Sequence, residues 1–193
     1  GGMLDLREGR LRQATARFRM AVTSSSTAAT YNYAHGNAWA GVPYAGVLYE
    51  ANDLTTAESL LNVYLPLARD VGLPDHMIAS YRMRSRIAFQ RGEVDVSLQL
   101  ITELEYLGRE RKLSRVTASA KLERSRVLAL QGHDLAAREE IARACDPVVW
   151  DDVQHQHRPA QEVEDIFISN FRIELQFGRP FDHVDQLEEE IRR

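Results

Sequence analysis

One stretch of the chain reads Leu48-Tyr49-Glu50-Ala51-Asn52-Asp53-Leu54-Thr55-Thr56-Ala57-Glu58-Ser59-Leu60-Leu61. In it a turn residue, Asn52, is followed by an apolar residue, Leu54, and then by a small one, Ala57. Similar phrases stand at residues 8–14, 91–97 and 131–137, and a weaker one at 177–181. The turn residues are Gly9, Asn52, Gly92, Gly132 and Gly178, so the spacings are 43, 40, 40 and 46 residues. Self-similarity at a nearly fixed period indicates an array of stacked supersecondary units.

The segments on both sides of each turn have the apolar spacing of amphipathic helices. After the first turn, for example, Leu11, Ala14 and Phe18 fall on one helix face. The pattern predicts second helices of successive pairs at 10–23, 54–71 and 93–111, and first helices at 33–51, 75–91, 114–131 and 159–177. We therefore predict an all-α fold of nine or ten helices in antiparallel pairs. The pairs are expected to stack as a right-handed superhelix with a concave inner face.

Small side chains recur in register with the turns. Seven residues before the first four turns stand Gly2, Ala45, Ser85 and Ser125, and five residues after the first three stand Ala14, Ala57 and Ser97. Small residues on both arms of a hairpin allow its helices to approach closely where they cross. The glycines and the asparagine at the turns are suited to the left-handed backbone that a tight helix end requires.

Local signals refine the helix ends. Pro74 suits the first turn of a helix, and Ser114 is the expected cap of another. Asp146-Pro147 is expected to end the helix that follows the fourth turn, because the residue before a proline resists helical geometry. Pro43 and Pro66 fall inside helical patterns, where we expect bends or displaced helix boundaries.

The two ends of the array differ from its middle. The fifth repeat, residues 159–193, is atypical, because Phe171 stands where a small residue is expected. Residues 3–8 read as the tail of a first helix. We predict that residues 1–193 form a single helical-repeat domain cut from a larger protein.

Composition excludes several classes. Charged residues make up 27% of the chain and its net charge is −4, which argues against direct contact with nucleic acid by this segment. No apolar run reaches the length that spans a bilayer, and the first residues show no signal peptide. The single cysteine, Cys145, forbids an internal disulfide and fits the cytoplasm, which is the expected location.

The offsets of the small residues resemble those of tetratricopeptide repeats (TPR), stretched beyond their usual length. Four longer sequence segments make the resemblance specific to one family. They are residues 48–61, Val71-Gly72-Leu73-Pro74-Asp75, residues 104–115 and residues 122–132. Over roughly residues 40–140 the chain resembles the helical-repeat region of MalT-like transcription activators of the LuxR family, which are bacterial and ATP-dependent.

The resemblance implies a function in transcription regulation. In that family an ATPase precedes the repeats, a helix-turn-helix domain follows them, and the repeats sense an inducer or a partner. Neither a phosphate-loop motif nor a recognition helix is readable in the chain. The expected function is therefore ligand or partner sensing by a region that signals to domains outside it. The alternative is a free-standing TPR adaptor that mediates protein–protein interactions.

No motif indicates an enzyme, a cofactor or a metal site. The sequence has no Gly-x-Ser-x-Gly and no His-Glu-x-x-His. Residues 150–157 contain two histidines and two aspartates, but His155 and His157 would diverge on a helix, so we favour a solvated loop there.

The concave face is the expected binding surface. Extrapolating tetratricopeptide geometry along the first helices selects Trp39, Tyr49, Glu50, Arg82, Arg86, Phe89, Gln90 and Arg126. Guanidinium groups beside aromatic rings could hold an anionic ligand or an acidic peptide. For Arg86 and Arg126 we favour pairing with Glu50 and Glu123 between neighbouring units. Arg82 has no assigned partner and is the better ligand candidate, and Trp39 is expected to face the groove.

Overall fold

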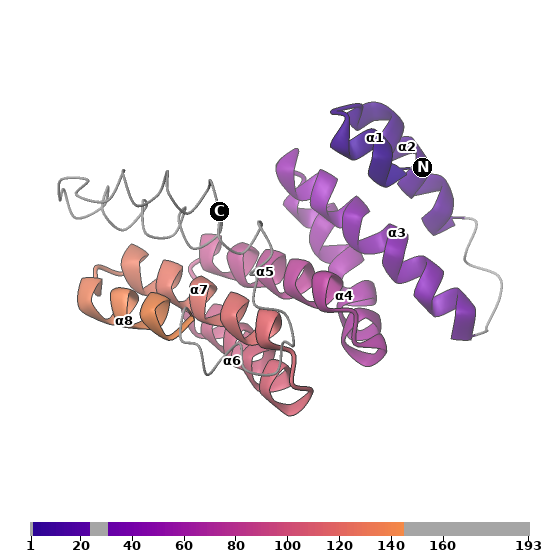
Figure 1. The fold of residues 1–193 in the computed structure, drawn as a ribbon. Coiled ribbons are helices and arrows are strands. Elements are labelled where there is room, and N and C mark those ends of the chain that lie inside the picture. The colour runs from indigo at the N-terminus through magenta and orange to yellow at the C-terminus, as the bar shows by residue number, and fades with distance from the viewer. Residues whose placement is uncertain (1, 24–30, 145–193) are drawn as a thin grey trace. The chain divides into compact units, whose positions relative to one another are not determined.

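The fold was examined in a computed structural model, which describes residues 2–23 and 31–144; at Thr23 and residues 31–39 it describes the helical backbone but not the side chains. These residues form eight helices and no strand (Figure 1). The helices are α1 (Gly2–Arg7), α2 (Leu11–Thr23), α3 (Tyr31–Glu50), α4 (Leu54–Val71), α5 (Pro74–Gln90), α6 (Val94–Glu110), α7 (Ser114–Leu130) and α8 (Asp134–Ala144). Every predicted helix that falls in this part of the chain agrees with these bounds to within two residues. The all-α, TPR-like fold with a period of about 40 residues is confirmed.

The turns inside the hairpins have the predicted left-handed backbone. The φ angles are +73° at Gly9, +61° at Asn52, +80° at Gly92 and +84° at Gly132. The fifth turn residue, Gly178, lies outside the described residues. The same conformation also occurs between hairpins, at Gly72 (+74°) and Lys112 (+53°), where the sequence analysis did not expect it.

The helix ends show which local signals decide the boundaries. Asp53 caps α4, because its Oδ1 accepts a hydrogen bond of 3.2 Å from the backbone N–H of Thr56. Pro74 begins α5 as predicted. The prediction that Ser114 caps its helix is wrong: Ser114 is the first residue of α7, and Leu113 occupies the cap position without a side-chain hydrogen bond.

The two prolines expected to bend helices or displace their boundaries do not interrupt either helix. Pro43 lies inside α3 and Pro66 inside α4, and both helices run past them to the predicted ends. The proposed stop at Asp146-Pro147 lies outside the described residues.

The small side chains fill the places where the two arms of a hairpin meet. Ala45, Ser85 and Ser125 are at most 1% exposed, and so are Ala14, Ala57 and Ser97. In the α5–α6 hairpin the Ser85 and Ser97 hydroxyl oxygens lie 2.7 Å apart. Ala137, five residues after the fourth turn and equally buried, belongs to the same set, although the sequence analysis did not include it. The register of small residues is therefore the contact line of the hairpins.

The chain divides into two compact units, Gly1–Ser97 and Leu98–Arg193, with the division inside α6. In the first unit, α3, α4 and α5 share an apolar core that includes Leu61, Tyr64 and Ile87, and Phe18 of α2 packs with Tyr44 of α3. In the second unit, residues of α7 and α8 pack together, Leu122 and Ile141 among them. That residues 1–193 form a single domain stays a prediction.

A buried ion network joins the helices of the second unit. The Glu105 carboxylate on α6 is 8% exposed and accepts a hydrogen bond of 3.0 Å from Lys121 Nζ on α7. Arg124 of α7 lies 2.5 Å from the other Glu105 oxygen and 3.1 Å from a carboxylate oxygen of Glu140 on α8. Burial acts to raise the pKa of Glu105, but the hydrogen bonds and charges of Arg124 and Lys121 outweigh it and hold the pKa below its ordinary range.

The first unit contains an equivalent pairing. Arg84 of α5 binds Glu58 of α4, and Arg91 lies 2.5 Å from the same carboxylate. Arg84 and Arg124 both stand eight residues before a turn glycine. In each unit, then, an arginine of a first helix reaches a glutamate of the preceding second helix. The sequence analysis missed this repeat of charge.

Replacement of Ala137 by leucine tests the contact line. We expect Ala137→Leu to lower the free energy of unfolding by about 1–3 kcal/mol, because the larger side chain must push α7 and α8 apart. Ala142→Leu, at an exposed position of the same helix, is the matched control and should change stability by less than about 0.5 kcal/mol. Urea unfolding of both variants measures the difference. Equal stabilities would contradict the assignment of a closed contact at residue 137.

Removal of the Glu105 charge tests the ion network. Glu105→Gln should lower the free energy of unfolding at pH 7 by about 3–5 kcal/mol, because Lys121 and Arg124 would lose a buried partner. Since the folded-state pKa of Glu105 is lowered, its contribution is complete above the unfolded-state pKa and is lost as the pH falls through the folded-state pKa.

The difference between the wild type and Glu105→Gln should therefore shrink as the pH falls below about 4.5, as urea unfolding over a pH series would show. Glu139→Gln removes the exposed partner of Arg143 and should have little effect. A difference between wild type and Glu105→Gln that stays constant down to pH 3 would argue against this role.

Candidate functional site

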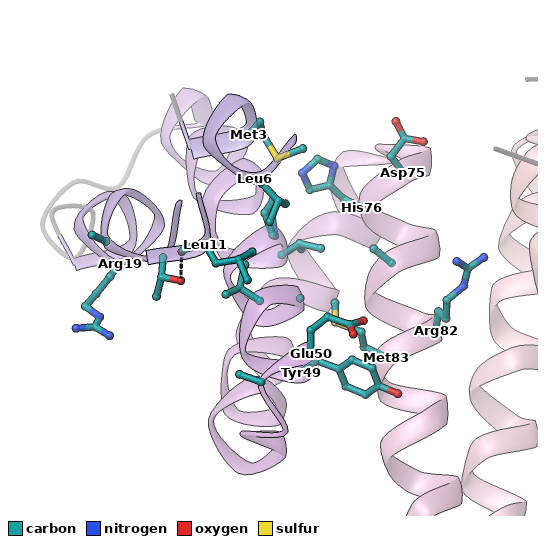
Figure 2. A pocket seen from close by; sticks show the side chains of 18 of the residues that line it. Met3, Leu6, Leu11, Arg19, Tyr49, Glu50, Asp75, His76, Arg82 and Met83 are labelled. Atoms are coloured by element: carbon teal, nitrogen blue, oxygen red, sulfur yellow. Dashed lines mark hydrogen bonds between the residues drawn. The ribbon is translucent and has the colours of Figure 1, made fainter. Parts of the chain in front are cut away.

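The first unit contains a cavity of about 890 Å³. It is lined by residues of α1, α2, α3 and α5, so three successive hairpins contribute to its wall (Figure 2). Its size falls in the range of small-molecule binding sites in proteins, about 300–1,000 Å³.

Most of the wall is apolar. Figure 2 shows Met3, Leu6 and Leu11 on the side of α1 and α2, and Met83 on α5. The remaining apolar lining residues are Ala16, Val42, Pro43, Val47, Ala51 and Ala79. Leu11 was expected to pack on the buried face of α2, but it is 57% exposed and its side chain forms part of this wall. Leu11 has the sequence spacing of a core residue because it follows the turn at Gly9. The neighbouring hairpin, however, does not cover its side chain.

The charged residues of the lining are unbalanced. Among the described lining residues are four arginines, Arg12, Arg19, Arg82 and Arg86, and two carboxylates, Glu50 and Asp75. The lining therefore carries excess positive charge, although the chain as a whole has a net charge of −4. One of the arginines is held at the wall, since Arg19 Nε donates a hydrogen bond of 3.2 Å to the Tyr44 hydroxyl.

The one histidine among the described lining residues is mostly neutral at pH 7. His76 of α5 is 7% exposed, and burial lowers its pKa below the ordinary value of 6.5, while the charge of Asp75 acts in the opposite direction. Because the imidazole is neutral, the excess positive charge of the cavity comes from the arginines alone. His76 was not selected from the sequence, where no motif distinguishes it.

Half of the residues predicted for the concave face meet at this cavity. Tyr49 and Glu50 reach it from the end of α3, and Arg82 and Arg86, which lie one turn apart on α5, reach it from a single helix face. Their role in binding stays a prediction.

The other four predicted residues are placed differently. Phe89 and Gln90 lie at the end of α5 and are not among the lining residues. Arg126 belongs to α7 in the second unit. Trp39 lies on α3, but its side chain is outside what the structure describes, so its proposed orientation stays a prediction.

The distinction drawn between the arginines does not hold. Arg82 was singled out because it had no assigned partner, yet Arg82, Arg86 and Arg126 all take part in interactions within the protein. The reason for preferring Arg82 over the other arginines is therefore removed, while its role as a ligand residue stays a prediction. The pairing of Arg86 with Glu50 and of Arg126 with Glu123 stays a prediction.

The part of the chain that the structure describes contains no cluster of three or more histidine, cysteine, aspartate or glutamate residues that could hold a metal ion. None of the described helices is long and apolar enough to cross a bilayer. Cys145 and the segment with His155 and His157 lie outside the described residues.

Two glycines of α3 offer a matched test of this geometry. A Cβ atom at Gly46, which lines the cavity, would have no neighbour within 4 Å, whereas a Cβ at Gly41 would lie 2.4 Å from the ring of Tyr64, a buried core residue. We expect Gly46→Ala to raise the free energy of unfolding by up to about 1 kcal/mol, because alanine favours the helix. Gly41→Ala should lower it by about 1–3 kcal/mol through overpacking. Chemical denaturation of the two variants measures both effects, and a destabilised Gly46→Ala would contradict an open cavity at that position.

A family model matches the chain. The family model described as "MalT-like TPR region" matches residues 2–191, which is nearly the whole chain. No curated protein and no solved structure matches the chain. The repeat of about 40 residues, the buried register of small side chains and the paired helices all agree with this match. The chain therefore belongs to the family of MalT-like TPR regions.

Proposed function

We propose that this chain is the sensing region of a MalT-like transcription regulator of the LuxR family, and that it binds a small-molecule inducer in the cavity of its first unit. The observation that carries the proposal is the cavity itself. A repeat protein whose hairpins packed without gaps would offer only a flat surface, whereas this unit has an open cavity of about 890 Å³ with a largely apolar wall.

The construction of the wall provides a route from binding to signalling. Because α1 and α2, α3, and α5 belong to three successive hairpins, a ligand in the cavity contacts all three. Binding favours the arrangement of hairpins in which these contacts are made together. The resulting shift in population is the signal proposed to reach the ATPase and the DNA-binding domain that regulators of this kind possess.

The proposal assigns no catalysis and no cofactor to this region. Its support is the absence of catalytic motifs from the sequence. DNA contact is assigned to the separate helix-turn-helix domain of such a regulator, in keeping with the net charge of −4. The proposed location is the bacterial cytoplasm, where a transcription regulator acts and where a single cysteine stays reduced.

A thermal-shift screen of sugars, nucleotides and small acids tests the proposal. A compound that binds the folded state raises the unfolding temperature by mass action, by an amount that grows with its concentration. We expect a selective rise for at least one class of compound with the wild-type chain. We expect a smaller rise with Gly46→Leu, whose side chain would enter the cavity at a position where a Cβ atom has no neighbour within 4 Å.

The outcomes separate the alternatives. A rise of equal size in the wild type and in Gly46→Leu would place the binding site elsewhere and contradict the proposal. The absence of any rise, together with capture of a peptide or protein partner, would favour the adaptor function.

A further inference from the structure

The lining of the cavity is poorly suited to a neutral, strongly hydrated ligand such as a sugar. Among the lining residues that the structure describes, only Thr15 and Tyr49 carry hydroxyl groups, and none is an asparagine, a glutamine or a serine. The Thr15 hydroxyl already donates a hydrogen bond of 2.7 Å to the backbone carbonyl of Leu11 (Figure 2). Ligand hydroxyl groups buried here would lose hydrogen bonds to water without replacing them.

The charges of the lining select for an anion. Arg82 and Arg86 project from one face of α5, and with Arg12 and Arg19 they outnumber Glu50 and Asp75, while His76 contributes no charge at pH 7. A guanidinium group binds a carboxylate, sulfonate or phosphate through two parallel hydrogen bonds. The two arginines on α5 therefore mark the part of the wall where an acidic head group would be held.

We infer that the ligand of this cavity is an anionic amphiphile, a small molecule with an apolar body and one acidic head group. The apolar body lies against the wall formed by α1, α2 and α3, and the head group lies against Arg82 and Arg86. The inference rests on the proposed function and narrows it to a class of ligand. It also explains why a chain of net negative charge keeps four arginines around one apolar cavity.

A pair of fluorescent probes tests the inference on the 193-residue chain. Anilinonaphthalene sulfonate has an apolar ring system with an acidic group, and phenylnaphthylamine has the same ring system without charge. Titrations should show that the sulfonate binds about tenfold or more tightly than the amine, since a hydrogen bond to a charged group contributes that much or more. Decanoate should displace the sulfonate, and a neutral disaccharide such as sucrose should not.

Three variants locate the binding. Gly46→Leu adds a bulky side chain to the cavity and should weaken the binding of both probes. The double variant Arg82→Gln/Arg86→Gln should weaken sulfonate binding about tenfold or more and leave amine binding unchanged. Arg69→Gln removes one positive charge from α4 of the same unit, outside the cavity lining, and should leave both titrations as in the wild type. Circular dichroism and unfolding curves confirm that each variant is folded.

The results distinguish the inference from the proposed function. One result would keep the cavity as a ligand site but overturn the assignment of an anionic ligand. In it, both probes bind equally well, Gly46→Leu weakens the binding of both, and the arginine double variant alters neither. If a folded Gly46→Leu binds both probes as the wild type does, the cavity is not the binding site and both proposals fail. Loss of sulfonate binding in Arg69→Gln as large as in the double variant would show general attraction to positive charge and would overturn the role of Arg82 and Arg86.

Discussion

The close approach of paired helices at small side chains is the constraint on which the rest of the structure depends. Ser85 and Ser97 meet with their hydroxyl oxygens 2.7 Å apart, and Ala45, Ala57 and Ser125 are equally buried at the corresponding positions. A larger side chain at any of these positions would separate the two arms of its hairpin. Because the contact line fixes the rotation of each helix about its axis, it also decides which residues face the next hairpin and which face outward.

Charge then joins one hairpin to the next. Arg84 and Arg124 occupy equivalent places in the repeat, and each binds a glutamate of the preceding second helix, Glu58 or Glu105. Glu105 also binds Lys121, so the buried charges of the second unit are compensated. Apolar contacts alone would allow small displacements between hairpins. Ion pairs of this kind form in only one arrangement of the helices. Any other arrangement would leave a buried charge without its partner, which is strongly destabilising.

The cavity follows from the same packing. In the first unit it opens to the solvent where residues of α1 and α2, α3, and α5 approach one another without filling the space between them. Gly41 and Gly46 illustrate the contrast on one helix: the first faces the ring of Tyr64 with no room for a Cβ atom, and the second faces open space. The cavity thus combines an apolar wall with arginines supplied by α2 and α5, which is the basis of the function proposed for this member of the MalT-like TPR regions.

The sequence by itself determined the helices, their pairing and the contact line, because these depend on local signals: the turn residues with positive φ, the apolar spacing and the small residues at fixed offsets. It also indicated Tyr49, Glu50, Arg82 and Arg86 as members of one surface, since their offsets in the repeat are regular. Only the tertiary structure decided that Leu11 and His76 belong to the same cavity, and that Phe89 does not. The physical reason is that a cavity is defined by what neighbouring hairpins leave unfilled, and this depends on side chains far apart in the sequence, whereas a helix and its turn depend on residues close together.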